Sequence, residues 1–144
     1  MTEPTLTSMI DYARKLHGHV GPYLVIGLRM GYAARKALNV SDDDVARLTT
    51  EISVPLYPPF SCLLDGIQVS TTCTVGNRRL HFKNGKTVKA IFSGQKDAKT
   101  VKITFTRQLT DQLEQMKKQD KLDEAFAWEL AKLPENQLFD ITYS

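Results

Sequence analysis

The stretch from Pro22 to Leu38 constrains the fold of this chain more than any other. Pro22 fits the first turn of a helix, because the backbone N–H that proline lacks would be unpaired there. The apolar residues that follow spread around the helix, which predicts burial on more than one side. Gly27 and Gly31 share a face with Ala34. Each interior glycine costs about 0.5–1 kcal/mol relative to alanine, so we expect this face to accept a second backbone, from the same chain or from a partner protomer.

The clearest strand signals lie between residues 79 and 106. Residues 79–83 and 87–92 flank Asn84-Gly85, a dipeptide typical of the type I′ turn, and therefore predict a β-hairpin. Residues 100–106 alternate between apolar and polar side chains. Together these segments predict an antiparallel sheet with one apolar face, which needs a cover. The helix of residues 22–38 is the natural cover.

Further helices are predicted over residues 7–16, 62–69, 108–121 and 122–133, where apolar residues recur at helical spacing. Residues 138–143 alternate again and predict an edge strand or a docking tail. The predicted fold class is therefore α+β: an antiparallel β-sheet covered by a long N-terminal helix, with additional C-terminal helices.

The composition narrows the functional classes. A chain of 144 residues with 42% hydrophobic residues predicts one domain over residues 1–144. The net charge of +3, without a basic run that includes aromatic residues, predicts no nucleic-acid partner. The apolar window of residues 22–38 is short and carries three basic residues, and residues 1–9 lack a signal-peptide pattern, so we expect no membrane association and a cytoplasmic location. In that reducing compartment, two cysteines are thiols or metal ligands more often than a disulfide.

His17 and His19 are the first candidates for chemistry. In an extended segment, residues two apart point the same way, which suits two imidazole ligands on one metal ion, typically zinc. A structural role for the pair is the alternative. His81 lies opposite to Leu80 and Phe82 in its predicted strand and is expected on a solvated face. The sequence contains no Ser-His-Asp motif, phosphate-binding loop or dinucleotide fingerprint.

Cys62 and Cys73 are the thiol candidates. Cys62 falls at the start of a predicted helix, where the helix dipole lowers the pKa of a thiol, although it could also be a buried small residue. Asp65, three residues later, could contact the metal, orient a ligand from the second shell, or simply favour the helix start. Cys73 joins Cys62 only if the helix stops near Val69 and the chain doubles back, and a disulfide would need the same reversal.

Several blocks of the chain resemble the formylmethanofuran dehydrogenase E-subunit family. The first is His17-Gly18-His19 with Pro22 and the helix from Leu28 to Ala34. The second is Cys62-Leu63-Leu64-Asp65-Gly66-Ile67-Gln68, and the third is Thr72-Cys73-Thr74-Val75-Gly76-Asn77, followed by Gly85-Lys86. Their order and approximate spacing resemble the family pattern from about residue 8 to residue 106.

This resemblance implies an α+β core that dimerises and binds a metal ion, zinc or another transition metal. Carried over by position, the implied ligands are His17, His19, Cys62 and Cys73. The resemblance also implies a setting of anaerobic one-carbon metabolism, with a molybdenum or tungsten enzyme as a partner.

The chain departs from the family pattern in three ways. Gly21 stands where family members often carry a cysteine, the loop before Cys62 is long and rich in proline, and residues 107–144 contain no cysteine or histidine that could form the C-terminal zinc finger of some members. Three hypotheses follow: a metal-binding accessory or metal-handling factor for a one-carbon enzyme, a zinc enzyme with an open coordination position, and a metal-free dimeric module with Gly27 and Gly31 at its interface.

Overall fold

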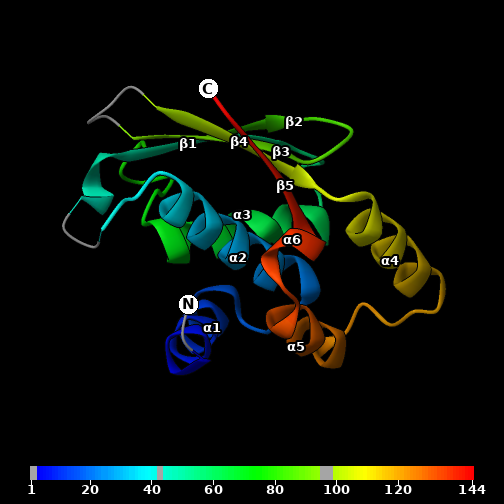
Figure 1. Cartoon of the computed structure of the whole chain (residues 1–144). Helices are drawn as coiled ribbons and strands as arrows, with labels where there is room; N and C mark the ends of the chain where they lie inside the picture. Colours follow the sequence, from blue (N-terminus) through cyan, green and yellow to red (C-terminus); the bar gives the residue numbers. More distant parts are fainter. Residues whose placement is uncertain (1–2, 42–43, 95–98) are drawn as a thin grey trace.

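The computed structural model describes residues 3–41, 44–94 and 99–144, and Figure 1 shows how they are arranged. In chain order the elements are α1 (Glu3–His17), α2 (Pro22–Ala37), the 3₁₀ turn η1 (Val45–Arg47), β1 (Leu48–Val54), the 3₁₀ turn η2 (Phe60–Cys62), α3 (Leu63–Thr71), β2 (Leu80–Asn84), β3 (Lys89–Gly94), β4 (Thr100–Phe105), α4 (Arg107–Lys118), α5 (Glu124–Lys132), α6 (Glu135–Leu138) and β5 (Phe139–Tyr143).

The strands form one sheet in the order β2-β1-β3-β4-β5. β1 runs parallel to β2 and antiparallel to β3, and the pairs β3–β4 and β4–β5 are antiparallel. The predicted α+β class is confirmed, with a sheet that is mixed but mostly antiparallel. The edge strand predicted near the C-terminus is also confirmed, because β5 pairs with β4 at one end of the strand order.

The hairpin predicted around Asn84-Gly85 is wrong. β2 and β3 lie on opposite sides of β1, so Ile52 pairs with Phe82 on one side and with Ala90 on the other. A type I′ turn would require positive φ angles at both Asn84 and Gly85, and neither residue has one. Instead, the Gly85 N–H donates to the carbonyl oxygen of Val54 at the end of β1 (3.1 Å). The local preference of Asn-Gly is outweighed because both strands gain a full ladder of hydrogen bonds with β1.

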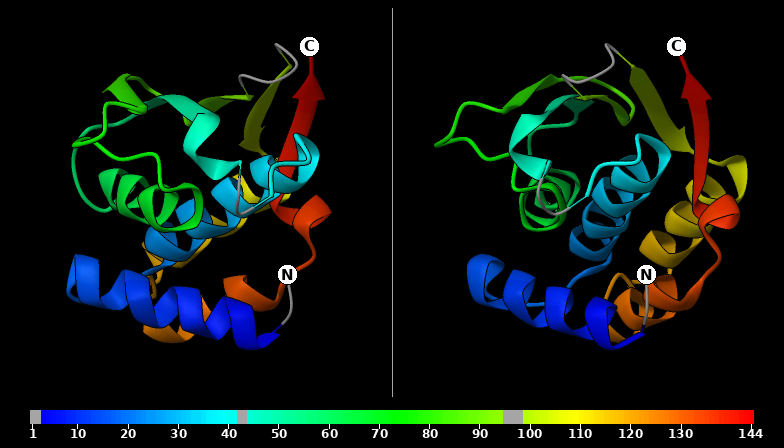
Figure 2. Two further views of the ribbon diagram at one scale, coloured as in Figure 1. Left: turned by 90° about the vertical axis from the view of Figure 1, so that its left-hand side faces the viewer. Right: turned by 60° about the vertical axis from the view of Figure 1, so that its left-hand side comes forward.

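The helices form two layers under the sheet. Figure 2 shows α2 and α3 beneath the strands, with α1 and α5 farther from them. The predicted cover is therefore confirmed, although α2 shares that layer with α3. Buried side chains on the inner face of the sheet, such as Phe92 and Ile103, join the buried residues of α2 in one hydrophobic core.

The small face of α2 packs inside the chain. A Cβ atom added to Gly27 would overlap the carbonyl oxygen of Leu63, one added to Gly31 would overlap the Ser70 side chain, and one added to Gly66 of α3 would overlap the carbonyl oxygen of Leu24. The hypothesis that Gly27 and Gly31 form a dimer interface is therefore wrong, because α3 of the same chain occupies this face. In the described part of the chain, no helix has both the length and the apolar composition to span a bilayer.

Candidate metal centre

The two candidate histidines lie where α1 ends. α1 stops at His17, and Gly18 takes a φ of +100°, a conformation that side chains other than glycine rarely adopt. The expectation of an extended segment at the histidine pair is therefore wrong. The turn still brings the two rings together, with their centroids 4.7 Å apart.

His17 forms a close pair with Asp65 from the first turn of α3. Its Nδ1 lies 2.7 Å from Oδ2 of Asp65, and Oδ1 of the same carboxylate accepts a hydrogen bond from Gln68 (3.1 Å). When Nδ1 carries the proton and donates to the carboxylate, the lone pair of the neutral ring is on Nε2. His17 Nε2 is buried and has no hydrogen-bond partner among the described residues. A polar atom buried in this way is ready to accept a ligand.

Cys62 lies at the N-terminal end of α3, three residues before Asp65. Its side chain is half-buried, and the following turn contains Asp65. Burial raises the pKa of the Cys62 thiol above its usual value, and the negative charge of Asp65 raises it further. The expectation of a lowered pKa was wrong, because these two effects outweigh the hydrogen bond at the helix start. A bound cation would reverse this balance by stabilising the thiolate.

Cys73 lies at the opposite end of α3. Thr72 ends the helix in a left-handed conformation (φ 58°), and Cys73 follows it with its side chain fully buried. Its thiol donates to the carbonyl oxygen of Leu48 (3.2 Å). The structure therefore brings His17 against Asp65 and beside His19, and it places Cys62 three residues before Asp65 at the start of α3. Cys73 lies at the other end of that helix. Over residues 3–41, 44–94 and 99–144, no three histidine, cysteine or acidic side chains are already grouped as ligands of one metal ion.

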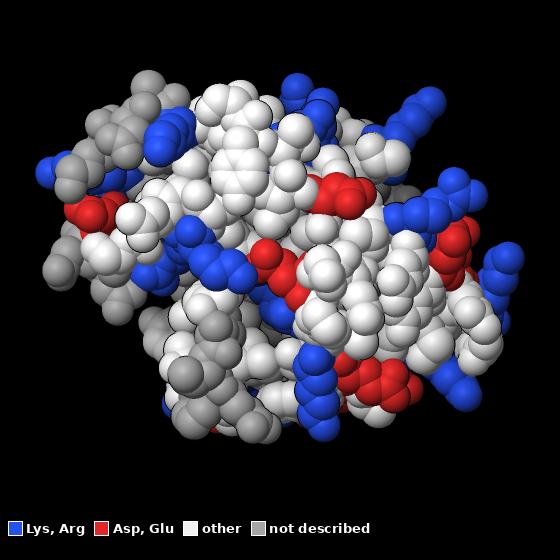
Figure 3. All heavy atoms as spheres, viewed as in Figure 1, with Lys and Arg blue, Asp and Glu red and all other residues white. Residues whose placement is uncertain are grey.

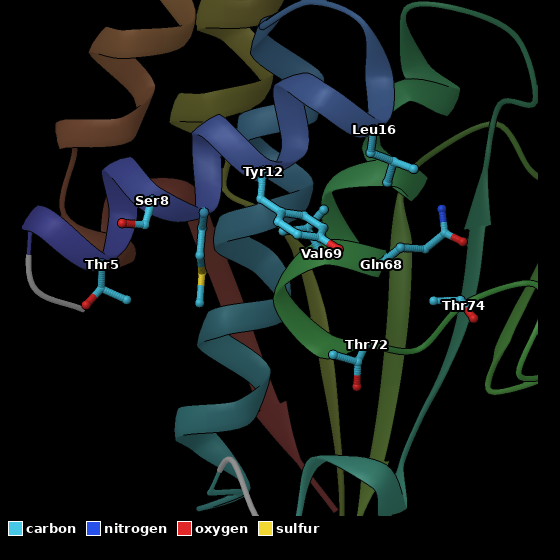
Figure 4. Close-up of a pocket in the computed structure, with 9 residues that line it drawn as sticks. Thr5, Ser8, Tyr12, Leu16, Gln68, Val69, Thr72 and Thr74 are labelled. Atoms are coloured by element: carbon cyan, nitrogen blue, oxygen red, sulfur yellow. The ribbon is translucent and has the colours of Figure 1, made fainter.

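A pocket of about 660 Å³ opens between α1 and α3, where its lining includes Leu16, the residue before His17, and Gln68. Figure 4 shows Tyr12 and Leu16 of α1 on one side and Gln68 and Val69 of α3 on the other, with Thr72 below. Gln68 joins the pocket to the His17–Asp65 pair, because its side chain lines the pocket and donates to Asp65. Sequence reasoning missed this pocket, and the only signal for it was the glutamine that closes the Cys62–Gln68 block.

Comparisons with known proteins agree with this architecture. Residues 16–140 match the family model described as FmdE, Molybdenum formylmethanofuran dehydrogenase operon. A curated relative, the Probable S-adenosyl-L-methionine-binding protein of Archaeoglobus fulgidus, is 35% identical over 99 residues. That alignment covers 68% of this chain and 26% of the relative, so the chain spans about a quarter of the relative's length.

The fold also matches the crystal structure of an FmdE-like protein from Syntrophus aciditrophicus, which is named after a tungsten formylmethanofuran dehydrogenase. The TM-score is 0.64, and the match covers 96% of this chain and 71% of that protein. The two sequences are 15% identical, so this likeness speaks for the fold alone.

Proposed function

Since the chain belongs to the FmdE family, we propose that it is a metal-binding protein of that family, with zinc or a similar transition metal at the end of α1. The observation that carries this proposal is the His17–Asp65 pair with its buried, unpartnered Nε2 atom. Histidine ligands of zinc commonly donate their second ring N–H to a carboxylate, which fixes the tautomer and orients the ring. Asp65 is in the right place for this supporting role.

The proposed ligands fit zinc by their chemistry. His17 would bind through Nε2, and the exposed His19 ring and the Cys62 thiol would turn towards the same ion. Imidazole and thiolate are the ligands that zinc prefers. A bound zinc ion would act as a Lewis acid and lower the pKa of a coordinated water. Cys73, the fourth predicted ligand, would reach the ion only if the end of α3 rearranged, so we expect it to matter least.

The proposed role is that of a cytoplasmic, homodimeric accessory or metal-handling factor for a molybdenum or tungsten enzyme of one-carbon metabolism. The support is the description of the family, which names the molybdenum formylmethanofuran dehydrogenase operon. Sedimentation equilibrium tests the dimer, and a monomer at every concentration would contradict it. Co-purification from a host that contains such an enzyme tests the partner.

Metal analysis of untagged protein is the decisive experiment. We expect about one zinc ion per chain in the wild type, and its loss in His17→Ala and in Cys62→Ala. Asp65→Asn should weaken zinc binding about 10–100-fold, because it removes only the orienting carboxylate. His81→Ala is the matched control, because the third histidine is exposed on β2. Circular dichroism verifies that each variant folds. Wild-type protein that stays metal-free after reconstitution with zinc would refute the proposal.

A metal-dependent enzyme is the second candidate, and the pocket beside Gln68 favours it. An enzyme needs a coordination position that protein ligands leave open. Cobalt-substituted protein shows whether such a position exists, since cyanide changes the visible spectrum when it occupies an open position. An unchanged spectrum would indicate a closed site and the accessory role.

A further inference from the structure

A second pocket lies away from the candidate metal centre, between α1, α2 and the end of α5. Its volume is about 480 Å³, and Figure 3 shows basic and acidic side chains gathered around a hollow near the middle of this face. We propose that this pocket binds an organic anion that carries a planar aromatic ring. This site is independent of the metal site proposed above.

The charge of the lining favours an anion. Arg29, Lys36 and Lys132 line the pocket, while Glu135 is the one acidic residue among its described lining residues. Glu135 pairs with Lys36 at 2.9 Å, and its negative charge also acts on Arg29. Three cations against this one carboxylate leave the lining with a net positive charge, which attracts a ligand of opposite charge.

Arg29 is fixed in place but keeps donors for a ligand. Its Nη1 donates to the carbonyl oxygens of Leu130 and Leu133, which anchors the guanidinium at the end of α5. Within the described residues, no hydrogen bond uses its Nε or Nη2 atoms. The guanidinium is partly buried, and this burial lowers the pKa of Arg29 against the opposing effect of Glu135. A positioned and partly desolvated guanidinium is well suited to a carboxylate or a phosphate, which it can bind through two donors.

The aromatic lining favours a planar ring. Trp128 and Tyr32 both line the pocket and are half-buried. The Trp128 ring is held from outside, because its Nε1 donates to Glu124 (3.1 Å), a residue that does not line the pocket. Aromatic side chains provide low-entropy stacking surfaces for planar ligands. A cavity that combines aromatic rings with cations therefore favours a ligand that combines a planar ring with a negative charge, such as a nucleotide or an aromatic carboxylate.

The fluorescence of Trp128 provides a direct test, because it is the only tryptophan of the chain. Zinc-free and zinc-loaded protein is titrated with AMP, benzoate, adenosine and inorganic phosphate. We expect saturable quenching by AMP or benzoate with a Kd of about 1 mM or tighter. Tighter binding of AMP would identify a nucleotide site, and tighter binding of benzoate would identify an aromatic carboxylate site. Adenosine and phosphate, which each lack one of the two features, should bind at least about tenfold more weakly.

Two charge variants complete the test without touching Arg29, whose loss could unfold the end of α5. Lys132→Gln should weaken binding several-fold, and Glu135→Gln should tighten it because it removes the competing carboxylate. Lys102→Gln is the matched control, since Lys102 is exposed on β4 and does not line the pocket. The absence of saturable quenching would overturn the proposal. It would also be overturned if phosphate bound as tightly as AMP, or if the two pocket variants behaved like the control.

Discussion

Gly27 of α2 and Leu63 of α3 meet backbone against backbone, so closely that a methyl group on Gly27 would overlap the Leu63 carbonyl oxygen. Gly27→Ala should therefore destabilise the fold by about 1–3 kcal/mol, as overpacking does in cores. This loss is expected even though alanine is favoured in helices. Gly76→Ala is the control, because the nearest atom to its Cβ would be 3.9 Å away. Urea unfolding measures both variants, and equal stabilities would contradict the packing.

The position of Gly85 against β1 gives a second prediction. A Cβ atom on Gly85 would overlap the side-chain oxygen of Ser53. Gly85→Ala should destabilise the protein, and Ser53→Ala should recover part of that loss in the double variant. We expect a coupling free energy of at least about 0.5 kcal/mol in a double-mutant cycle. Additive effects would argue that Gly85 does not lie beside β1.

Two buried threonines should respond in opposite directions to replacement by valine. Thr50 is fully buried, and its hydroxyl has no hydrogen-bond partner among the described residues. Thr50→Val keeps the shape and removes this unsatisfied group, so stability should rise by about 1 kcal/mol. The Thr71 hydroxyl donates to Ile67 (2.6 Å) and accepts from the Cys73 N–H (3.0 Å). Thr71→Val should cost about 1–3 kcal/mol. Thermal unfolding of the two variants tests this prediction, and a loss of stability in Thr50→Val would contradict it.

Tyr23 should make the protein less stable in alkali. Burial, together with the charge of Glu114, raises the pKa of Tyr23 to about 12 in the folded protein, against about 10 in an unfolded chain. Above about pH 10 the unfolded chain releases this proton first, so the free energy of unfolding falls as the pH rises towards about 12. This contribution is fully present below about pH 10.

The Tyr23→Phe variant should lack that part of the pH dependence. Urea unfolding at several pH values from about 9 to 11 compares it with the wild type. Tyr143→Phe, which alters an exposed tyrosine, shows whether loss of any phenol group has the same effect. If wild type and Tyr23→Phe lose stability in parallel, the prediction is wrong.

Gly21 offers a gain-of-function test of the proposed metal site. Its backbone is extended (φ −125°, ψ 168°), and a Cβ atom would lie 3.6 Å from Nε2 of His19, an ordinary contact. Gly21→Cys would therefore place a thiol next to His19 and should tighten zinc binding by at least about tenfold. Gly21→Ser has nearly the same shape without the thiolate and is the matched control. Equal zinc affinities of the two variants would count against a metal site here.

Local patterns predicted the elements well but not all of their partners. The apolar run of residues 22–38 identified α2, and the alternation after residue 100 identified β4. The choice of β1 as the neighbour of both β2 and β3 depends on contacts between distant residues, which a turn dipeptide does not encode. The small face of α2 was visible in the sequence, but its occupant, α3, was not.

The candidate site was likewise predicted only in part from the sequence. The Cys62–Gln68 block pointed to Asp65, and the structure places that carboxylate against His17. The sign of the Cys62 pKa shift depended on burial, which sequence spacing does not reveal. The pocket lined by Arg29 and Trp128 was not predicted, because its walls come from helices about a hundred residues apart in the chain.

The central place of β1 also limits the order in which the chain can assemble. β2 and β3 are separated by only four residues, yet a hairpin between them would close off the position that β1 must fill. Productive folding must instead join Thr50 to Leu80, thirty positions later. A hairpin that forms early between β2 and β3 would therefore compete with the native pairing of β1 and β2. Rapid formation of such a hairpin at Asn84-Gly85 would slow the folding of this protein.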